Sequence, residues 1–256
     1  MADSPVYILT DPDALADAAA DRFIALAADA IAARGSAAVA LAGGSTPRAM
    51  NARLAASPRR EQLDWTKLRF FFGDERCVPP DHPDSNYRMT RETLFAPLDI
   101  APTQIERVLA EDEPHAAAAA YDDALRAALG PAPVFDIVFL GMGPDGHTAS
   151  LFPGTIAGID ENRLAVANFV PKFDSYRVTL TPRVLNAARQ ITITAAGAEK
   201  AGALAAVIDG PREPDTFPAQ LIAPQSGELA WLVDAAAAAQ LRPSAALQRE
   251  PAAPRR

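Results

Sequence analysis

VFDIVFLGMGPDGHTASLFPG, at residues 134–154, contains an apolar run over 134–140 that ends in a cluster of glycines, and His147 follows the last of them. A short run rich in Val, Ile and Phe and bounded by glycines is typical of a buried strand in a parallel sheet. Ligands of such sheets bind beyond the carboxyl ends of the strands. This stretch therefore places Asp145 and His147 where chemistry would be done.

Apolar runs alternate with helical patterns along the rest of the chain. Strands are predicted at 6–9, 37–42, 68–72, 164–170, 178–180, 191–195 and 229–233. Helices are predicted at 13–33, after 47 to 56, and at 87–95, 115–129, 182–188 and 200–208, with a short one from 218. Such alternation predicts a single-domain α/β fold, a mostly parallel Rossmann-like sheet flanked by helices. Residues 1–241 form the predicted domain, and 242–256, which lack an apolar period, a flexible tail.

Composition argues against nucleic-acid binding, membrane association and a cysteine-based zinc site. The 256 residues are 49% hydrophobic with a net charge of −8, and the absence of a Lys/Arg cluster argues against a nucleic-acid partner. The sequence shows neither a signal peptide nor about 20 consecutive apolar residues, so no membrane association is expected. Cys77 is the only cysteine, which excludes an internal disulfide and a cysteine-based zinc site. A cytoplasmic location is expected.

Residues 41–46, LAGGST, have the features of an anion site. Gly43 and Gly44 let the backbone approach a ligand, and Ser45 and Thr46 add hydroxyl donors where a helix begins. Free N–H groups and the helix dipole favour a phosphate there. An N-capped helix after a tight turn explains the segment equally well. It is not a Walker A loop, because no Gly-Lys-Ser/Thr follows.

Residues 141–146 match G-x-G-x-x-G, a pattern of dinucleotide sites. Pro153 and Gly154 interrupt the helix that would have to face a pyrophosphate, and the segment lies in mid-chain. The match alone does not support a dinucleotide cofactor.

His147 is a candidate general base, because it directly follows a glycine turn and lies beside Asp145. A structural histidine is the alternative. Ser150 has i,i+3 spacing from His147, but no G-x-S-x-G elbow surrounds it, so a surface hydroxyl is expected. His82 in a loop and His115 at an exposed helix start give no support to a metal site.

Charged residues at other element ends could bind an anion. Arg76 follows a strand and could stabilise an oxyanion, or it could pair with Asp74 and Glu75. Lys200, one of only three lysines, lies at a helix start, and Arg177 precedes an apolar strand. Both are equally compatible with a surface position.

Taken together, seven motifs resemble the 6-phosphogluconolactonase family, within the group that includes glucosamine-6-phosphate deaminases. They are LAGGSTP (41–47), FFGDER (71–76), DSNYRM (84–89), GMGPDGHTASLFPG (141–154), RVTLTP (177–182), GAEK (197–200) and FPAQLI (217–222). The resemblance implies hydrolysis of 6-phospho-D-glucono-1,5-lactone to 6-phosphogluconate, in the oxidative pentose phosphate pathway, without a metal or organic cofactor.

The resemblance also implies roles for individual residues. His147 would be the base that activates water, Arg76 would face the oxyanion or the sugar, and Asp145 and Asn86 would orient the substrate or His147. The implied phosphate site consists of Gly43, Gly44, Ser45, Thr46, Arg177 and Lys200.

Two alternatives stay open. Deaminases of the group carry a catalytic Glu five residues after the histidine, where this chain has Phe152, and GDER replaces their aspartate-glutamate-tyrosine pattern. A non-catalytic sugar-phosphate sensor would keep the phosphate loop but would not need His147. No heptad or interface stripe indicates an assembly, so a monomer or weak homodimer is expected.

Overall fold

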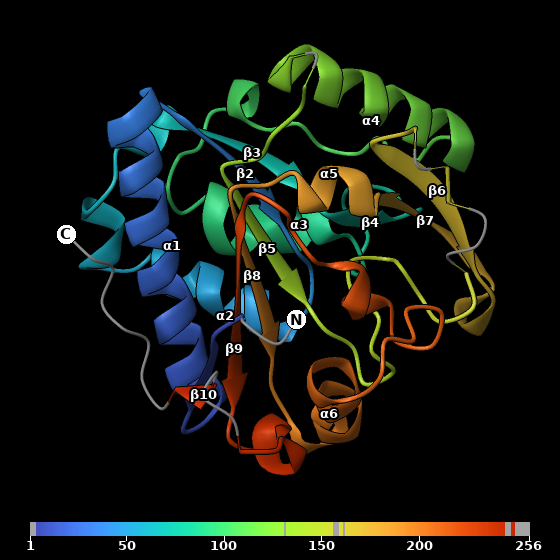
Figure 1. Cartoon of the computed structure of the whole chain (residues 1–256). Coiled ribbons are helices and arrows are strands. Elements are labelled where there is room, and N and C mark those ends of the chain that lie inside the picture. The colour runs from blue at the N-terminus through green and yellow to red at the C-terminus, as the bar shows by residue number, and fades with distance from the viewer. Residues whose placement is uncertain (1–3, 131, 156–158, 161, 244–246, 249–256) are drawn as a thin grey trace.

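The computed structural model describes residues 4–130, 132–155, 159–160, 162–243 and 247–248. Its main sheet has the strand order β10-β1-β9-β8-β5-β2-β3, and all neighbouring strands are parallel (Figure 1). The strands are β1 Val6–Leu9, β2 Ala37–Leu41, β3 Leu68–Phe72, β5 Ile137–Gly141, β8 Gln190–Ala195, β9 Glu228–Asp234 and β10 Leu247–Gln248. The prediction of a parallel α/β sheet flanked by helices is confirmed.

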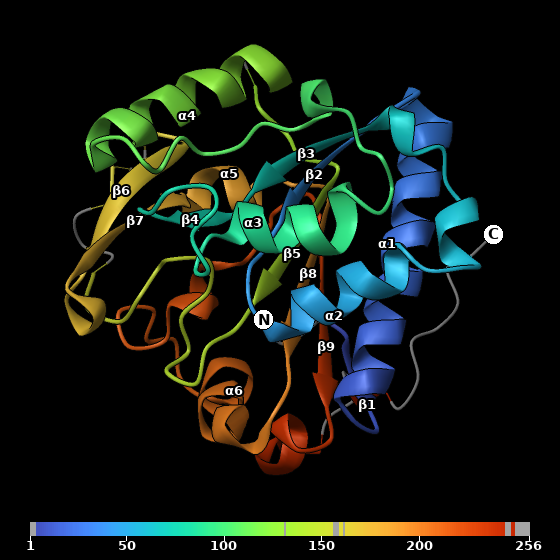
Figure 2. The same cartoon turned by 180° about the vertical axis from the view of Figure 1, so that it is seen from behind.

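The helices are α1 Pro12–Arg34, α2 Ser45–Leu54, α3 Asn86–Thr90, α4 Pro114–Leu129, α5 Pro182–Asn186 and α6 Ala201–Asp209. From behind, α2 and α3 lie in front of the strands and α2 runs beside α1 (Figure 2). The predicted helix at 87–95 is α3 continued by a π-helical turn, and the short one from 218 is a 3₁₀ turn.

In helix α1 the local sequence determines where the helix begins and ends, and aromatic packing stabilises it against the sheet. The Asp11 carboxylate accepts from the Ala14 N–H at 2.8 Å, and Gly35 ends the helix with φ 81°. On the buried side Phe23 stacks on Trp65, 6.0 Å between ring centroids, and packs against Phe139 at 5.8 Å. This aromatic cluster lies in the core between the helix and the sheet.

A second sheet was not anticipated. Strands β4 Asp74–Arg76, β6 Ala165–Val170 and β7 Ser175–Leu180 form it in the antiparallel order β4-β7-β6, beneath α4 (Figure 1). Only four residues join β6 to β7, which is too short for the crossover that a parallel pair needs. Two of the predicted strands therefore leave the parallel sheet and form a hairpin.

Gly73 joins the two sheets. Its N–H donates to the Leu41 carbonyl of β2, and its own carbonyl accepts from the Leu180 N–H of β7. The chain thus passes from the main sheet into the small one within a single residue, which brings Asp74 and Arg76 to the boundary between them.

The predicted tail, residues 242–256, lies partly outside the described residues. Of the part that the structure describes, Leu247–Gln248 pairs with β1 at Val6 and Tyr7, and the Arg242 N–H donates to Asp209 at 2.7 Å. These residues therefore contact the domain, and the division of the chain at 241 stays a prediction. None of the helices in the described ranges has the length and apolarity to cross a membrane.

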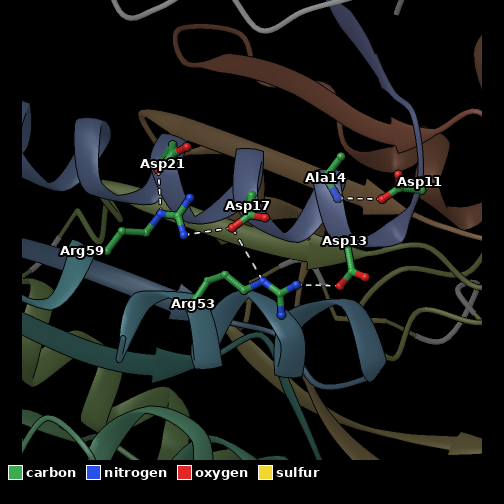
Figure 3. Close-up of polar contacts among 7 residues, drawn as sticks. All are labelled: Asp11, Asp13, Ala14, Asp17, Asp21, Arg53 and Arg59. Carbon is green, nitrogen blue, oxygen red and sulfur yellow. Dashed lines mark hydrogen bonds and ion pairs between the residues drawn. The ribbon is translucent and has the colours of Figure 1, made fainter. Parts of the chain in front are cut away.

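An ion-pair ladder holds α2 against α1 (Figure 3). Asp17 of α1 accepts from Arg59 at 2.9 Å and lies 3.6 Å from Arg53, while Arg59 also pairs with Asp21 at 2.7 Å and Arg53 with Asp13 at 2.5 Å. The shared Asp17 links the two arginines into one network. Arg53 lies in the last turn of α2 and Arg59 in the 3₁₀ turn that follows, so the ladder ties this end of the helix to α1.

Replacing Arg59 with Ala should lower the free energy of unfolding by about 1 kcal/mol. The side chain is largely covered and pairs with two carboxylates, so it should contribute more stability than a single exposed ion pair does. Chemical denaturation at low and high salt measures this, and the difference from wild type should shrink at high salt. Arg91→Ala, at an exposed arginine, is the matched control. Equal stability of the Arg59 and Arg91 variants would show that the ladder contributes nothing.

Candidate active site

A pocket of about 270 Å³ opens where β2, β5 and β8 end and the small sheet meets the main sheet. Most of the predicted site residues line it: Gly43, Gly44, Ser45, Thr46, Arg76, His147, Arg177 and Lys200. Asn86 and Asp145 are not among the lining residues; they lie behind them. The pocket lies beyond the carboxyl ends of parallel strands, which is where α/β sheets bind ligands.

His147 and Asp145 form a hydrogen-bonded pair in the turn after β5. The turn is closed by the Gly143 N–H donating to the His147 carbonyl at 2.9 Å, with Gly146 at φ 75°. The His147 Nδ1 lies 2.5 Å from Asp145 Oδ1. An ionised carboxylate only accepts, so Nδ1 donates and Nε2 is the basic nitrogen of the neutral ring. Asp145 thus sets the tautomer that a general base needs.

Asp145 is held in the ionised form. Burial acts to raise the pKa of its carboxyl, but the hydrogen bonds from His147 and Lys172 oppose burial and hold that pKa well below its ordinary value. Lys172 Nζ donates to the second carboxylate oxygen at 3.0 Å. Asp145 therefore remains an acceptor for His147 across the neutral pH range.

Cationic groups and free N–H groups gather on the pocket wall around α2. This helix begins at Ser45 after Gly44, whose φ is 107°, and no side chain of the described residues caps it. Arg76 and Arg177 occupy the same register position of β4 and β7. Burial and the charge of Arg76 lower the pKa of Arg177, and burial lowers the pKa of Lys200. Like charges held together at a helix N-terminus favour a bound anion.

Asp74 and Ser150 lie deeper in the pocket, and the expectation of a surface hydroxyl at Ser150 is wrong. The side chain is buried and donates to Asp74 Oδ2 at 2.6 Å, and its carbonyl accepts from Asn168 at 2.8 Å. The reason is tertiary, since β4, β6 and β7 cover the turn that carries Ser150. The proton of the Ser150 hydroxyl is therefore engaged by Asp74 and not by His147.

Asn86 is buried and contacts β4 rather than His147. Its amide donates to the Asp74 carbonyl at 2.9 Å and lies 3.3 Å from Asp74 Oδ1, and its side chain fills the space where a Cβ at Gly43 would lie. Glu75 fixes this arrangement by accepting from the Asn86 and Tyr87 N–H groups, each at 2.8 Å. A role for Asn86 toward the substrate stays a prediction.

Two phenylalanines pack in series beside His147. Phe152 stacks on His147, with 4.0 Å between ring centroids and 23° between planes, and Phe173 meets Phe152 edge-on at 5.7 Å. Phe152 lines the pocket and occupies the position of the glutamate expected in a deaminase. An apolar ring there cannot transfer a proton.

Comparisons with known proteins identify relatives of this chain. Residues 10–231 match the family model described as glucosamine-6-phosphate isomerases/6-phosphogluconolactonase. A 6-phosphogluconolactonase from Nostoc is 40% identical over 92% of this chain and 98% of its own length, and one from Haemophilus influenzae is 39% identical over 78% and 85%. The solved 6-phosphogluconolactonase of Trypanosoma cruzi superposes with a TM-score of 0.84 at 31% identity, covering 94% of this chain and 98% of the other.

The chain belongs to the glucosamine-6-phosphate isomerase/6-phosphogluconolactonase family. Three features of this family member were missed from sequence: the Asp74–Ser150 bond, the Phe152–His147 stack and the Lys172–Asp145 pair. The first joins residues 76 positions apart, which no local spacing signals. The stack could have been suspected, because Phe152 follows His147 within the same turn segment.

No group of three or more His, Cys, Asp or Glu side chains is placed to hold a metal ion within the part of the chain that the structure describes. Independence from metal remains a prediction for this family member, to be tested by activity in a chelator.

Gly143 is required for the close approach of His147 and Asp145. A Cβ at this position would overlap the His147 ring and touch Asp145 Oδ1. Gly143→Ala should therefore displace the imidazole and lower kcat by about 10²-fold, since a displacement of about 1 Å in a site can have that effect. Steady-state kinetics measure this. Gly202→Ala, at an exposed helix position with only ordinary contact, is the control, and wild-type kcat in the Gly143 variant would contradict the prediction.

Proposed function

We propose that this protein hydrolyses 6-phospho-D-glucono-1,5-lactone to 6-phospho-D-gluconate, the second step of the oxidative pentose phosphate pathway. One observation carries the proposal: a single pocket holds the imidazole of His147, whose Nδ1 is bonded to Asp145, together with a set of cations at an uncapped helix start. A phosphorylated lactone needs both, an anchor for its phosphate and a base for the water that attacks its carbonyl.

In the proposed mechanism His147 Nε2 takes a proton from water as the water oxygen attacks C1 of the lactone. Arg76 faces the oxyanion that develops on the carbonyl oxygen. When this intermediate collapses, the bond between C1 and the ring oxygen breaks, and His147 returns the proton to that oxygen. General-base help is worth roughly 10²–10⁴-fold in rate.

The proposed phosphate anchor consists of Gly43, Gly44, Ser45, Thr46, Arg177 and Lys200. The phosphate is remote from the reacting carbon, so its binding energy can hold the ester against the base. Arg177 is partly buried and lies beside the positive charge of Arg76, which supports this role. A bound anion would offset the repulsion between the two arginines.

The deaminase alternative is disfavoured by a specific contact. Phe152 stacks on His147 where ring opening of an amino sugar would need a carboxylate. A sensor without catalysis would not need the Asp145–His147 pair.

The decisive experiment generates the lactone in situ and follows acid release at neutral pH with and without the purified protein, in a metal chelator. Acceleration above spontaneous opening that persists in chelator is expected. Ammonia release from glucosamine 6-phosphate would instead favour the deaminase. If neither assay detected activity, the result would favour the sensor. We also propose a cytoplasmic location, no required cofactor, and a monomer or weak homodimer, which sedimentation at several concentrations tests.

A further inference from the structure

The hairpin that joins β6 to β7 brings its tip to the candidate base. The tip is a 3₁₀ turn, Pro171–Phe173, followed by Asp174 at φ 46°. Lys172 keeps 55% of its side-chain surface exposed and Phe173 is 48% exposed. Neither residue contributes to the core, so their contacts with the site are not a by-product of folding.

Lys172 reaches His147 through Asp145. The two oxygens of the Asp145 carboxylate are divided between two donors, His147 Nδ1 at 2.5 Å and Lys172 Nζ at 3.0 Å. A carboxylate held at both oxygens cannot rotate away from the imidazole. The ion pair is exposed, so it adds little to folding stability. Its main effect is to orient the Asp145 carboxylate toward His147.

Phe173 reaches His147 through Phe152. Its ring meets Phe152 edge-on, with 82° between planes, and Phe152 in turn stacks on the face of the imidazole. The Arg177 guanidinium lies 5.3 Å from the centroid of the Phe173 ring. Offset stacking and edge-to-face contacts are the favoured arrangements of aromatic pairs. Phe152 is therefore supported by a second ring, that of Phe173.

We propose that Lys172 and Phe173 at the tip of the β6–β7 hairpin are positioning residues for His147, which hold the imidazole in its plane through Asp145 and against its face through Phe152. This inference rests on the proposed lactonase function, in which His147 is the base. Phe173 itself lines the pocket, whereas Lys172 is not among the lining residues.

The proposal has a consequence for the pH profile. The charged groups around His147 are Asp145 in its own turn, Lys172 at the hairpin tip, Asp74 and Arg76 on β4, Arg177 on β7 and Lys200 before α6. The positive charge of Lys172 partly offsets the negative charge of Asp145. Without Lys172, the carboxylate would attract a protonated imidazole more strongly. The acid limb of the kcat profile should then move to higher pH by about 0.3–0.5 unit.

The test compares Lys172→Met, Lys172→Arg and Phe173→Ala with Lys67→Met, which removes the same charge from an exposed position just before β3. We expect kcat to fall about tenfold in Lys172→Met and Phe173→Ala with KM within twofold of wild type. Lys172→Arg should restore kcat to within about threefold, and Lys67→Met should match wild type. Only Lys172→Met should shift the acid limb.

A second readout needs no substrate. The Nδ1–H···Oδ1 hydrogen bond should give a downfield imidazole N–H proton resonance, assigned by its loss in His147→Gln. This resonance should broaden or move in Lys172→Met and Phe173→Ala. Wild-type kcat, pH profile and resonance in both variants would overturn the proposal. An inactive wild-type protein with the expected changes in the resonance would refute the lactonase function but keep the positioning role.

Discussion

Replacing His147 with Gln should lower kcat for the phosphorylated lactone by about 10²–10⁴-fold, the usual contribution of a general base. Gln keeps an amide that can donate to Asp145 but has no basic nitrogen, so the proton of the attacking water has no acceptor. KM should stay within a few-fold, because the cations of the pocket are unchanged. Initial rates corrected for spontaneous opening measure both constants.

His82 and His115 provide matched controls for this variant, since His82 lies in a loop and His115 packs edge-on against Tyr176 on the small sheet. His82→Gln and His115→Gln should retain wild-type kcat. A His147 variant that folds, as judged by its melting temperature, and turns over lactone at the wild-type rate would remove the proposed mechanism.

Arg177→Met should lower kcat/KM for the phosphorylated lactone by about 10–150-fold, the equivalent of one or two hydrogen bonds to a charged group at 1.5–3 kcal/mol in total. The unphosphorylated glucono-1,5-lactone separates phosphate binding from chemistry. With that substrate the variant and the wild type should react at similar rates, because Arg177 would have no anion to bind.

The control for Arg177 is Arg189→Met, which removes a guanidinium just before β8, at the amino end of the sheet. This variant should match the wild type with both substrates. Equal losses of Arg177→Met with phosphorylated and unphosphorylated lactone would contradict a phosphate contact and assign the arginine to the reacting end of the substrate.

Local sequence was a good guide wherever the physical signal is local. The bounds of β1 and β3 are those predicted, and α1 agrees to within one residue because Asp11 caps it and Gly35 ends it. Sequence placed Asp145 beside His147 within one glycine turn but left open whether it orients the substrate or the histidine, and the structure shows the hydrogen bond to His147. Caps, apolar periods and turns depend on neighbouring residues only, and the chain alone specifies them.

The small antiparallel sheet could not be predicted in the same way. Its strand β4 has three residues, too few to show a period, and its place depends on Gly73 bonding to two different sheets. Ser150 was misjudged for the same reason, because its burial arises from strands remote in the chain.

The amino-acid pattern alone specifies the parallel α/β sheet, the glycine turns at the ends of β2 and β5, and eight of the residues that line the pocket. The contacts that support the site became visible only in the folded chain: Asp74 with Ser150, Lys172 with Asp145 and Phe173 with Phe152. The physical reason is that strand and turn formation follow from short-range propensity and capping. Contacts between residues 21 to 76 positions apart depend instead on the register of β4, β6 and β7, which is fixed only when the two sheets pack.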